Sequence, residues 1–223
     1  MKKQLIKEYT GRFIMCALGL MLFGFGNFLG VKAGSAGTNA WSTLSLGLAD
    51  MTGLSFGINN FIISLIIIVI DIIGRGKMGF GTIMNAVLIS LFSDVFIGIF
   101  SFIPNATNPI IGTVLSMLGQ TIIAFSIVFY TRPALGCGPR DTLMVLFAKA
   151  FPKAPIGVVK FALEIIVLII GVLMGAPFGI ATVLTLALQS FIFQFVCKIM
   201  KYDIRTIEHE DIFDTIKRIT GKN

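Results

Sequence analysis

Residues 136–141, which read Gly-Cys-Gly-Pro-Arg-Asp, combine the residue types best suited to binding a small anion. Pro139 suits the first turn of a helix, so a short helix is predicted to begin just before Arg140. The free N–H groups and positive dipole of a helix start attract anions, and the Arg140 guanidinium adds five donors. Asp141 would pair with Arg140 or cap the helix. The residues expected to hold an anionic or polar group are Gly136, Gly138, Arg140 and Asp141. A Gly-rich surface loop followed by an interfacial helix is the alternative.

A second Gly-rich segment, residues 34–39, precedes another short apolar stretch. Asn39 or Thr38 suits the N-cap of a helix there, and we expect Asn39 and Ser42 to contribute to the same substrate site. Trp41, the single tryptophan, stands where the other segment has Arg140, which predicts an asymmetric site dominated by the second segment. Since tryptophan usually anchors a protein at the membrane interface, we predict that role for Trp41; stacking within the site is the alternative.

Carboxylates inside apolar runs are candidates for binding a coupling proton or cation. A charge in hydrocarbon costs about 2.5–3.5 kcal/mol on insertion scales, so each one needs a partner or a function. Glu164 lies well inside one apolar run, with Lys160 one helical turn earlier on the same face. Ser90 and Asp94 share a face of another run. The expected ion-coupling residues are Glu164, Asp94 and Ser90. A buried ion pair for Glu164, and interhelical hydrogen bonds for the other two, are the alternatives.

The sequence lacks the motifs of common enzyme and metal sites. It has no Gly-x-Ser-x-Gly, no P-loop, one histidine (His209) and three widely spaced cysteines (Cys16, Cys137 and Cys197). Scattered ionisable residues do not form the cluster that general acid–base catalysis needs. We therefore expect no enzymatic activity, no metal and no cofactor.

The composition indicates that these residues are positioned by membrane-spanning helices. Of 223 residues 56% are hydrophobic and 13% charged, whereas about 25% are charged in an average soluble domain. A soluble domain of this size could not bury so much apolar surface, and the unbroken apolar runs argue against a β-barrel. The net charge of +7 comes mostly from residues at the ends of these runs. It therefore indicates membrane topology, with the lipid bilayer and a small-molecule substrate as partners and no nucleic acid. No sequence feature indicates an oligomeric state.

Six apolar runs have the length of about 20 residues that spans a bilayer. They cover residues 13–31, 57–74, 79–103, 109–130, 156–174 and 178–200. Residues 40–51 and 141–151 are shorter and are predicted to be re-entrant half-helices. After residue 201 the chain is polar, with Ile204, Ile207, Ile212 and Ile216 at loosely helical spacing. This spacing predicts an amphipathic surface helix, with polar coil as the alternative. Asp71, four residues before Arg75, is expected to form an interfacial pair.

The two halves of the apolar part resemble each other at an offset of about 100 residues, which predicts an internal repeat. The matches are Gly57 with Gly157, Phe61 with Phe161, Gly79-Phe-Gly-Thr82 with Gly179-Ile-Ala-Thr182, Ser90 with Ser190, and Ala40-Trp-Ser-Thr-Leu44 with Pro139-Arg-Asp-Thr-Leu143. Six spans would invert the second copy. With the N-terminus inside, every basic residue except Lys32 then lies inside, as the positive-inside rule prefers. Eight spans with parallel repeats, the alternative, would move several basic residues outside.

The predicted fold is therefore an all-α polytopic membrane protein with six transmembrane helices, two re-entrant half-helices and an inverted repeat. Residues 1–12 form a cytoplasmic segment, 13–103 the first repeat, 109–200 the second and 201–223 a cytoplasmic amphipathic tail.

The sequence resembles the YczE/YyaS/YitT family of bacterial integral membrane proteins over roughly residues 10–200. The resemblance is carried by Gly37-Thr-Asn-Ala-Trp-Ser-Thr-Leu44, Gly79-Phe-Gly-Thr82 and Gly136-Cys-Gly-Pro-Arg-Asp-Thr-Leu143. In the first of these the sequence has Ala40-Trp41-Ser42 where the family has Pro-Trp-Asp, so a charge is absent. The resemblance implies a location in the bacterial cytoplasmic membrane and no settled biochemical activity. From the residues, we expect a small secondary transporter or permease; a non-transporting scaffold or regulatory protein is the alternative.

Overall fold

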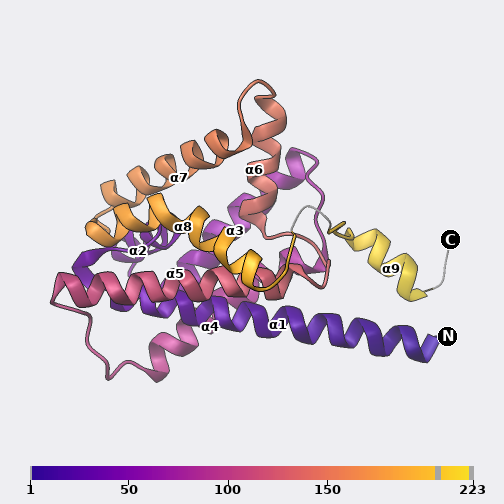
Figure 1. Ribbon diagram of the computed structural model, residues 1–223, viewed down its shortest axis with the longest axis horizontal. Coiled ribbons are helices and arrows are strands. Elements are labelled where there is room, and N and C mark those ends of the chain that lie inside the picture. Colours follow the sequence, from indigo (N-terminus) through magenta and orange to yellow (C-terminus); the bar gives the residue numbers. More distant parts are fainter. Residues whose placement is uncertain (1, 204–206, 221–223) are drawn as a thin grey trace.

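The protein is all-helical in the part that its computed structural model describes, residues 2–203 and 207–220 (Figure 1). The elements in chain order are α1 (Lys2–Lys32), the short 3₁₀ helix η1 (Gly34–Ala36), α2 (Ala40–Thr52), α3 (Phe56–Ile73), α4 (Phe80–Ile99), α5 (Pro109–Thr131), α6 (Pro139–Ala150), α7 (Ile156–Leu173), α8 (Ile180–Ile199) and α9 (Ile212–Thr220).

Six helices of the described chain are long and apolar enough to cross a membrane: α1, α3, α4, α5, α7 and α8. Large apolar side chains such as Ile66, Ile70, Ile166 and Leu173 are exposed on their outer faces, as expected of surfaces that contact lipid. The chain is therefore a multi-pass membrane protein.

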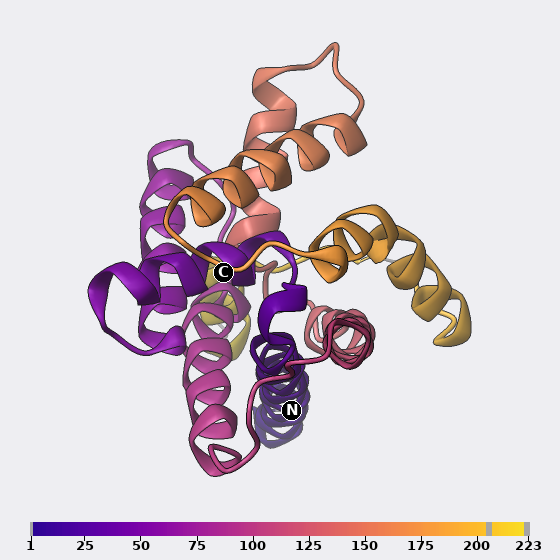
Figure 2. The same ribbon diagram turned by 90° about the vertical axis from the view of Figure 1, so that its left-hand side faces the viewer.

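The short helices α2 and α6 lie across the direction of α1 and α5 (Figures 1 and 2). With 13 and 12 residues each is about 20 Å long at about 1.5 Å per residue, too short for a hydrocarbon core of about 30 Å. The structure therefore agrees with six spans and gives no support to the alternative of eight.

Glycines allow the long helices at the centre to approach closely. A Cβ atom added to Gly119 of α5 would lie 2.6 Å from the carbonyl oxygen of Gly26 in α1, and one added to Gly19 would lie 2.7 Å from the backbone nitrogen of Tyr130. Membrane helices pack through small residues in this way because little hydrophobic force draws them together. The pair α1–α5 forms the centre, with α4 packed on α1 and α8 packed on α5.

The two Gly-rich loops contact the helix starts of the opposite half of the chain. At Gly37, where φ is +82°, an added Cβ would overlap the Thr182 hydroxyl beside the start of α8. At Gly136, where φ is +120°, it would lie 2.7 Å from the Cα of Gly79 before α4. Thr82 accepts from the Gly79 N–H at 3.2 Å and donates to the Cys137 carbonyl at 2.6 Å. Each half is therefore fastened to the other at a helix start.

Helix α1 begins at Lys2 and so includes residues 2–12 of the charged segment, whose cytoplasmic location stays a prediction. Two other sequence predictions differ from the structure near the helix ends. The helix of the tail is limited to α9; Ile207 precedes it in non-helical chain and Ile204 lies outside the described residues. The reason is that Glu210 N–H and Ile212 N–H bond to the carbonyls of Ala134 and Met78 instead, at 2.9 and 3.1 Å.

The expected ion pair between Asp71 and Arg75 is also wrong. The helix that would place them one turn apart ends at Ile73, and Arg75 has a left-handed backbone with φ of +56°. Asp71 is fully buried, and both its carboxylate oxygens lack a hydrogen-bond partner among the described residues.

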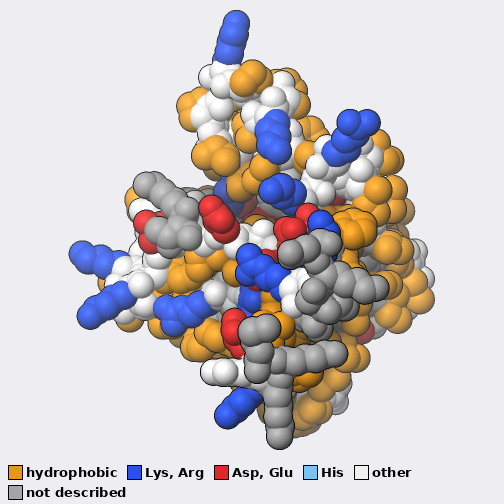
Figure 3. Space-filling model, turned by 90° about the vertical axis from the view of Figure 1, so that its right-hand side faces the viewer, with side chains coloured by type: hydrophobic (Ala, Val, Ile, Leu, Met, Phe, Trp, Pro, Cys, Tyr) orange, Lys and Arg blue, Asp and Glu red, His pale blue; other side chains and the backbone are white. Residues whose placement is uncertain are grey.

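One end of the molecule carries the start of α1 together with α9 (Figure 1). Seen from that end, Lys and Arg side chains are spread over the surface (Figure 3). An even number of spans places the start of α1 and the end of α8 on the same side of the membrane.

Candidate functional site

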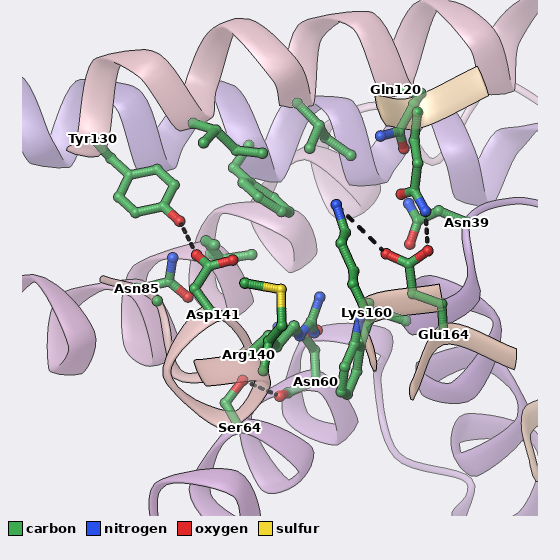
Figure 4. A pocket seen from close by; sticks show the side chains of 18 of the residues that line it. Asn39, Asn60, Ser64, Asn85, Gln120, Tyr130, Arg140, Asp141, Lys160 and Glu164 are labelled. Atoms are coloured by element: carbon green, nitrogen blue, oxygen red, sulfur yellow. Dashed lines mark hydrogen bonds and ion pairs between the residues drawn. The ribbon is translucent and has the colours of Figure 1, made fainter. Parts of the chain in front are cut away.

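A polar cavity of about 130 Å³ lies where the two halves of the chain meet (Figure 4). It is about ten times the 10–15 Å³ that one water molecule needs. The residues that line it are Phe23, Asn39, Trp41, Asn60, Ser64, Asn85, Ile89, Gln120, Ile123, Ile127, Tyr130, Gly138, Arg140, Asp141, Met144, Lys160, Leu163, Glu164 and Gln189. All helices from α1 to α8 contribute, counting Asn39 and Gly138 as the N-caps of α2 and α6.

Arg140 is fixed by two residues of the first half. Its Nη2 donates to Asn60 Oδ1 at 2.5 Å, and its guanidinium lies 4.7 Å from the centre of the Trp41 ring. Asn60 is itself fully buried, and its amide donates to Ser90 Oγ at 3.0 Å. Since a guanidinium carries five N–H donors, this arrangement orients Arg140 and leaves donors for a ligand.

Asp141 presents a carboxylate to the same cavity but does not pair with Arg140. Consecutive residues of a helix do not face each other, and the ion pairs of the described residues do not include these two. Asp141 instead accepts from the Tyr130 hydroxyl at 3.1 Å. Nor does it act as the cap of α6, whose N-cap is Gly138. Both roles expected of Asp141 are therefore wrong, and its carboxylate faces the cavity.

Glu164 joins α7 to α8 on another wall of the cavity. Its side chain is buried, lies 3.8 Å from the ammonium of Lys160 and accepts from the amide of Gln189. The ion pair between Glu164 and Lys160 predicted from their spacing is confirmed. Lys160 is only partly buried, so the pair lies at the border between the packed interior and the cavity.

Gln120 adds an unpaired acceptor to the lining. The residue is 8% exposed, and its Oε1 has no hydrogen-bond partner among the described residues. A buried acceptor left unpaired costs about 1–3 kcal/mol. In Figure 4, Gln120 and Glu164 lie toward one end of the cavity, and Tyr130 and Asp141 toward the other.

Five of the nine residues predicted for the site line the cavity together. They are Asn39, Gly138, Arg140, Asp141 and Glu164. Of the two residues predicted as the N-cap of α2, Asn39 and Thr38, the structure has Asn39, which accepts from the Ser42 N–H at 3.0 Å. Gly136 instead packs against Gly79, as described above, and Ser42 donates to Asn27 at 3.3 Å.

The structure places Ser90 and Asp94 outside the lining. Ser90 accepts a hydrogen bond from the amide of Asn60, which itself lines the cavity. Asp94 accepts from the Gly57 N–H at 2.6 Å and from the hydroxyl of Ser55, so it caps the start of α3 from a neighbouring helix. A carboxylate at a helix start is stabilised by the dipole and the free N–H groups. Structural hydrogen bonding, the alternative considered for both, accounts for their contacts.

Sequence reasoning assigned Trp41 to the membrane interface, whereas the structure places it in the cavity beneath Arg140. The interface rule applies to a tryptophan that faces lipid, whereas the ring of Trp41 contacts the Arg140 guanidinium of α6. Nor were Asn60, Gln120 and Tyr130 predicted from the sequence as residues of the site, although all three line the cavity. One signal could have found Asn60: it stands 100 residues before Lys160, the offset of the repeat.

The described residues contain no group of three or more His, Cys, Asp or Glu side chains that could hold a metal ion. The charged groups of the cavity are two basic and two acidic side chains from α6 and α7. The arrangement can therefore bind a polar or charged solute through hydrogen bonds and ion pairs.

Comparisons with known proteins found a matching family model and similar proteins. Residues 10–198 match DUF6198, described as a family of unknown function. An uncharacterized protein of Haemophilus influenzae is 31% identical over 181 residues, 81% of each chain. The uncharacterized membrane protein YczE of Bacillus subtilis is 31% identical over 199 residues, 87% of each chain. No solved structure matches the chain.

Proposed function

Because this chain belongs to the family of unknown function DUF6198, its activity has to be inferred from its own site, and we propose that it is a small secondary transporter or permease for a polar solute. The observation that carries this proposal is the cavity. Four charged side chains and five amides from seven helices converge on one space inside a membrane protein. Ionisable residues there are costly and usually mark a solute or ion path, whereas a scaffold needs only a packed bundle. We propose no catalytic reaction.

The contacts between the halves support an inverted repeat. The Gly37 loop rests on the Thr182 turn, and the Gly136 loop rests on the turn that ends at Thr82, so the same contact is made twice with the halves exchanged. Transporters built from inverted repeats bind their solute where the repeats meet, which is where the cavity lies.

The two halves differ in how closely their corresponding helices approach each other: α3 and α4 in the first half, α7 and α8 in the second. Alternating access requires such a difference between the halves in any one state. A Cβ on Gly57 of α3 would lie 2.2 Å from the Ser90 carbonyl of α4, so these helices touch; the matching Gly157 of α7 has no such neighbour within 4 Å. Figure 2 shows α7 and α8 diverging. We propose that the exchange of these two arrangements moves the solute.

The basic end is proposed to face the cytoplasm of a bacterium, with the protein in the inner membrane. Short loops on the cytoplasmic side of a membrane carry an excess of Lys and Arg. Figure 3 shows Lys and Arg side chains spread over the end of the molecule that holds the start of α1. Both termini would then be cytoplasmic, and Lys32 would lie near the outer surface.

Transport is tested with purified protein in liposomes. Radiolabelled small polar solutes are supplied outside, with and without a proton or sodium gradient, and uptake is compared with protein-free liposomes. Saturable uptake of at least one solute supports the proposal. Uptake equal to that of empty liposomes across the panel rejects it and leaves a scaffold as the better function.

A scaffold is the second candidate, and one observation favours it. Helix α9 exposes the ring of Phe213, which is 75% accessible, at the basic end of the molecule. Such a side chain could contact another protein or the bilayer surface. Crosslinking from position 213 to lipid alone would remove this support.

A further inference from the structure

The charges that line the cavity are balanced rather than anionic or cationic. Two basic side chains, Arg140 and Lys160, face two acidic ones, Asp141 and Glu164. Of these, Lys160 and Glu164 already pair with each other. Among the residues that the structure describes, the hydrogen-bond partners of Arg140 and Asp141 are the neutral Asn60 and Tyr130, and neither side chain forms a salt bridge. In this part of the chain the cavity therefore offers a ligand one cation and one anion that are not held in a salt bridge.

Neither a simple anion nor a simple cation would satisfy both groups. An anion on Arg140 would leave Asp141 without a counter-charge, and a cation on Asp141 would do the same to Arg140. Arg140 is half-buried and Asp141 is exposed, but both line a cavity of a membrane protein, where a charge without a counter-charge is unfavourable. A ligand that carries both signs satisfies both groups at once.

Gln120, which lies toward the other end of the cavity from Asp141 (Figure 4), offers an acceptor for a further hydrogen-bond donor of the ligand. Its buried Oε1 lines the cavity without a hydrogen-bond partner in the part of the chain that the structure describes, and it can accept a hydrogen bond from an N–H or O–H group. Trp41 does not offer a free aromatic face for a methylated ammonium, because the Arg140 guanidinium already covers its ring. An ammonium that keeps its N–H groups suits this lining better than a quaternary one.

We propose that the solute is a small zwitterion, an amino-acid-like molecule with a primary ammonium group whose carboxylate binds Arg140 and whose ammonium binds Asp141. This inference rests on the proposed function, since it names the substrate class of the same cavity. The cavity volume of about 130 Å³ restricts the solute to a few carbon atoms.

The test measures binding to purified protein by equilibrium dialysis, which does not require transport. The ligands are radiolabelled glycine, β-alanine and γ-aminobutyrate, which differ in the distance between their charges. Propionate, propylamine and trimethylglycine compete as an anion, a cation and a zwitterion without N–H groups. We expect at least one amino acid to bind about tenfold or more tightly than each competitor, the loss expected when one charge-assisted bond is missing.

Two variants test which side chain binds the ammonium of the ligand and which binds its carboxylate. Asp141→Asn should weaken amino-acid binding about tenfold while improving propionate relative to propylamine. Arg140→Gln should change the preference in the opposite direction. A misfolded variant would lose all ligands equally, so a change of preference is specific to the proposal. Lys149→Gln, at an exposed position of the same helix, is the control and should bind like the unchanged protein.

Propionate that binds as tightly as the amino acids, equal loss of all ligands in variants that keep a normal melting profile, or no binding by any of the three amino acids overturns the zwitterion assignment. Transport of an anion by a protein that does not bind amino acids would overturn this inference but keep the proposed function. Amino-acid binding without flux in liposomes would keep this inference but overturn the proposed transport function.

Discussion

Arg140 depends on two side chains contributed by the other half of the chain. The side-chain oxygen of Asn60 accepts a hydrogen bond from the Arg140 guanidinium, and the Trp41 ring packs against the face of that guanidinium. Lysine keeps the charge but has no planar fork and stacks less well on an aromatic ring. The position therefore requires the shape of arginine as well as its charge.

From this geometry we expect Arg140→Lys to weaken binding of the best amino acid by about 1–3 kcal/mol. Trp41→Phe keeps an aromatic face beneath the guanidinium and should cost less, since a cation–π contact contributes about 0.5–2 kcal/mol in total. Equilibrium dialysis of both variants measures the two costs. Equal or reversed costs would show that the first half dominates the site.

Glu164 should be required for coupled transport and not for folding. Glu164→Gln keeps a polar side chain beside Gln189 and removes the ionisable group. We expect a normal melting profile, retained amino-acid binding and loss of gradient-driven uptake in liposomes. Glu208→Gln, the same chemical change at an exposed position of the tail, is the control. Full gradient-driven flux through folded Glu164→Gln protein would end the coupling role.

Asp94 should matter for stability alone. Its carboxylate caps the start of α3, and loss of a helix cap costs about 1 kcal/mol. Asp94→Ala should lower the melting temperature in detergent and leave amino-acid affinity unchanged, and Asp50→Ala, at an exposed position of α2, should change neither. Loss of coupled flux in a stable Asp94→Ala protein would return Asp94 to the coupling site.

At the scale of elements, the tail is held to the bundle by one buried carboxylate. Glu210 accepts hydrogen bonds from Tyr9, Arg12, Thr215 and Arg218 at 2.8–3.0 Å. Burial alone would raise the pKa of Glu210, but the hydrogen bonds from Arg12, Tyr9 and Thr215 outweigh it and hold the pKa below the usual value. The neighbouring His209 has a lowered pKa because it is buried, although Asp141 opposes this effect.

Acidification should therefore release α9. Both groups have a lower pKa when the tail is docked, so the undocked tail binds more protons and is favoured as pH falls. Docking is complete above the ordinary His pKa of 6.5 and weakens below it. A further loss follows below the ordinary Glu pKa of 4.5. A spin label at position 213 should become more mobile over this range.

Glu210→Gln should mobilise the same label already at neutral pH, because the carboxylate that bonds the two arginines is gone. Glu208→Gln should leave it unchanged. A label that remains immobile in Glu210→Gln would show that the backbone bonds to Met78 and Ala134 hold the tail without the carboxylate.

At the scale of the whole molecule, the six-span arrangement predicts which loops are accessible from each side. Cysteine at the exposed Asn105 should react with an impermeant maleimide in intact cells, and cysteine at the exposed Lys77 only after lysis. Cys16, Cys137 and Cys197 are first replaced by alanine or serine. The opposite labelling pattern would reverse the orientation, and labelling of both in intact cells would rule out the six-span arrangement.

Local features made the helices and part of the cavity predictable from the sequence. Long apolar runs identified the six candidate spans, and the Gly-Pro start and the charge inside an apolar run identified Arg140, Asp141 and Glu164. Gln120 and Tyr130 join the cavity only through the packing of α5 with helices distant in the sequence, which no local pattern encodes. The error on Trp41 has the same origin, since its role depends on a helix almost one hundred residues away.

The contact between Gly37 and Thr182 also sets an order for biogenesis. Residues around Gly37 leave the ribosome early, whereas Thr182 follows only after five of the six candidate spanning helices of the described chain have been made. The loop at Gly37 is therefore covered only after α8 has been synthesised. A nascent chain stalled before α8 would expose that loop to the quality-control proteases of the membrane.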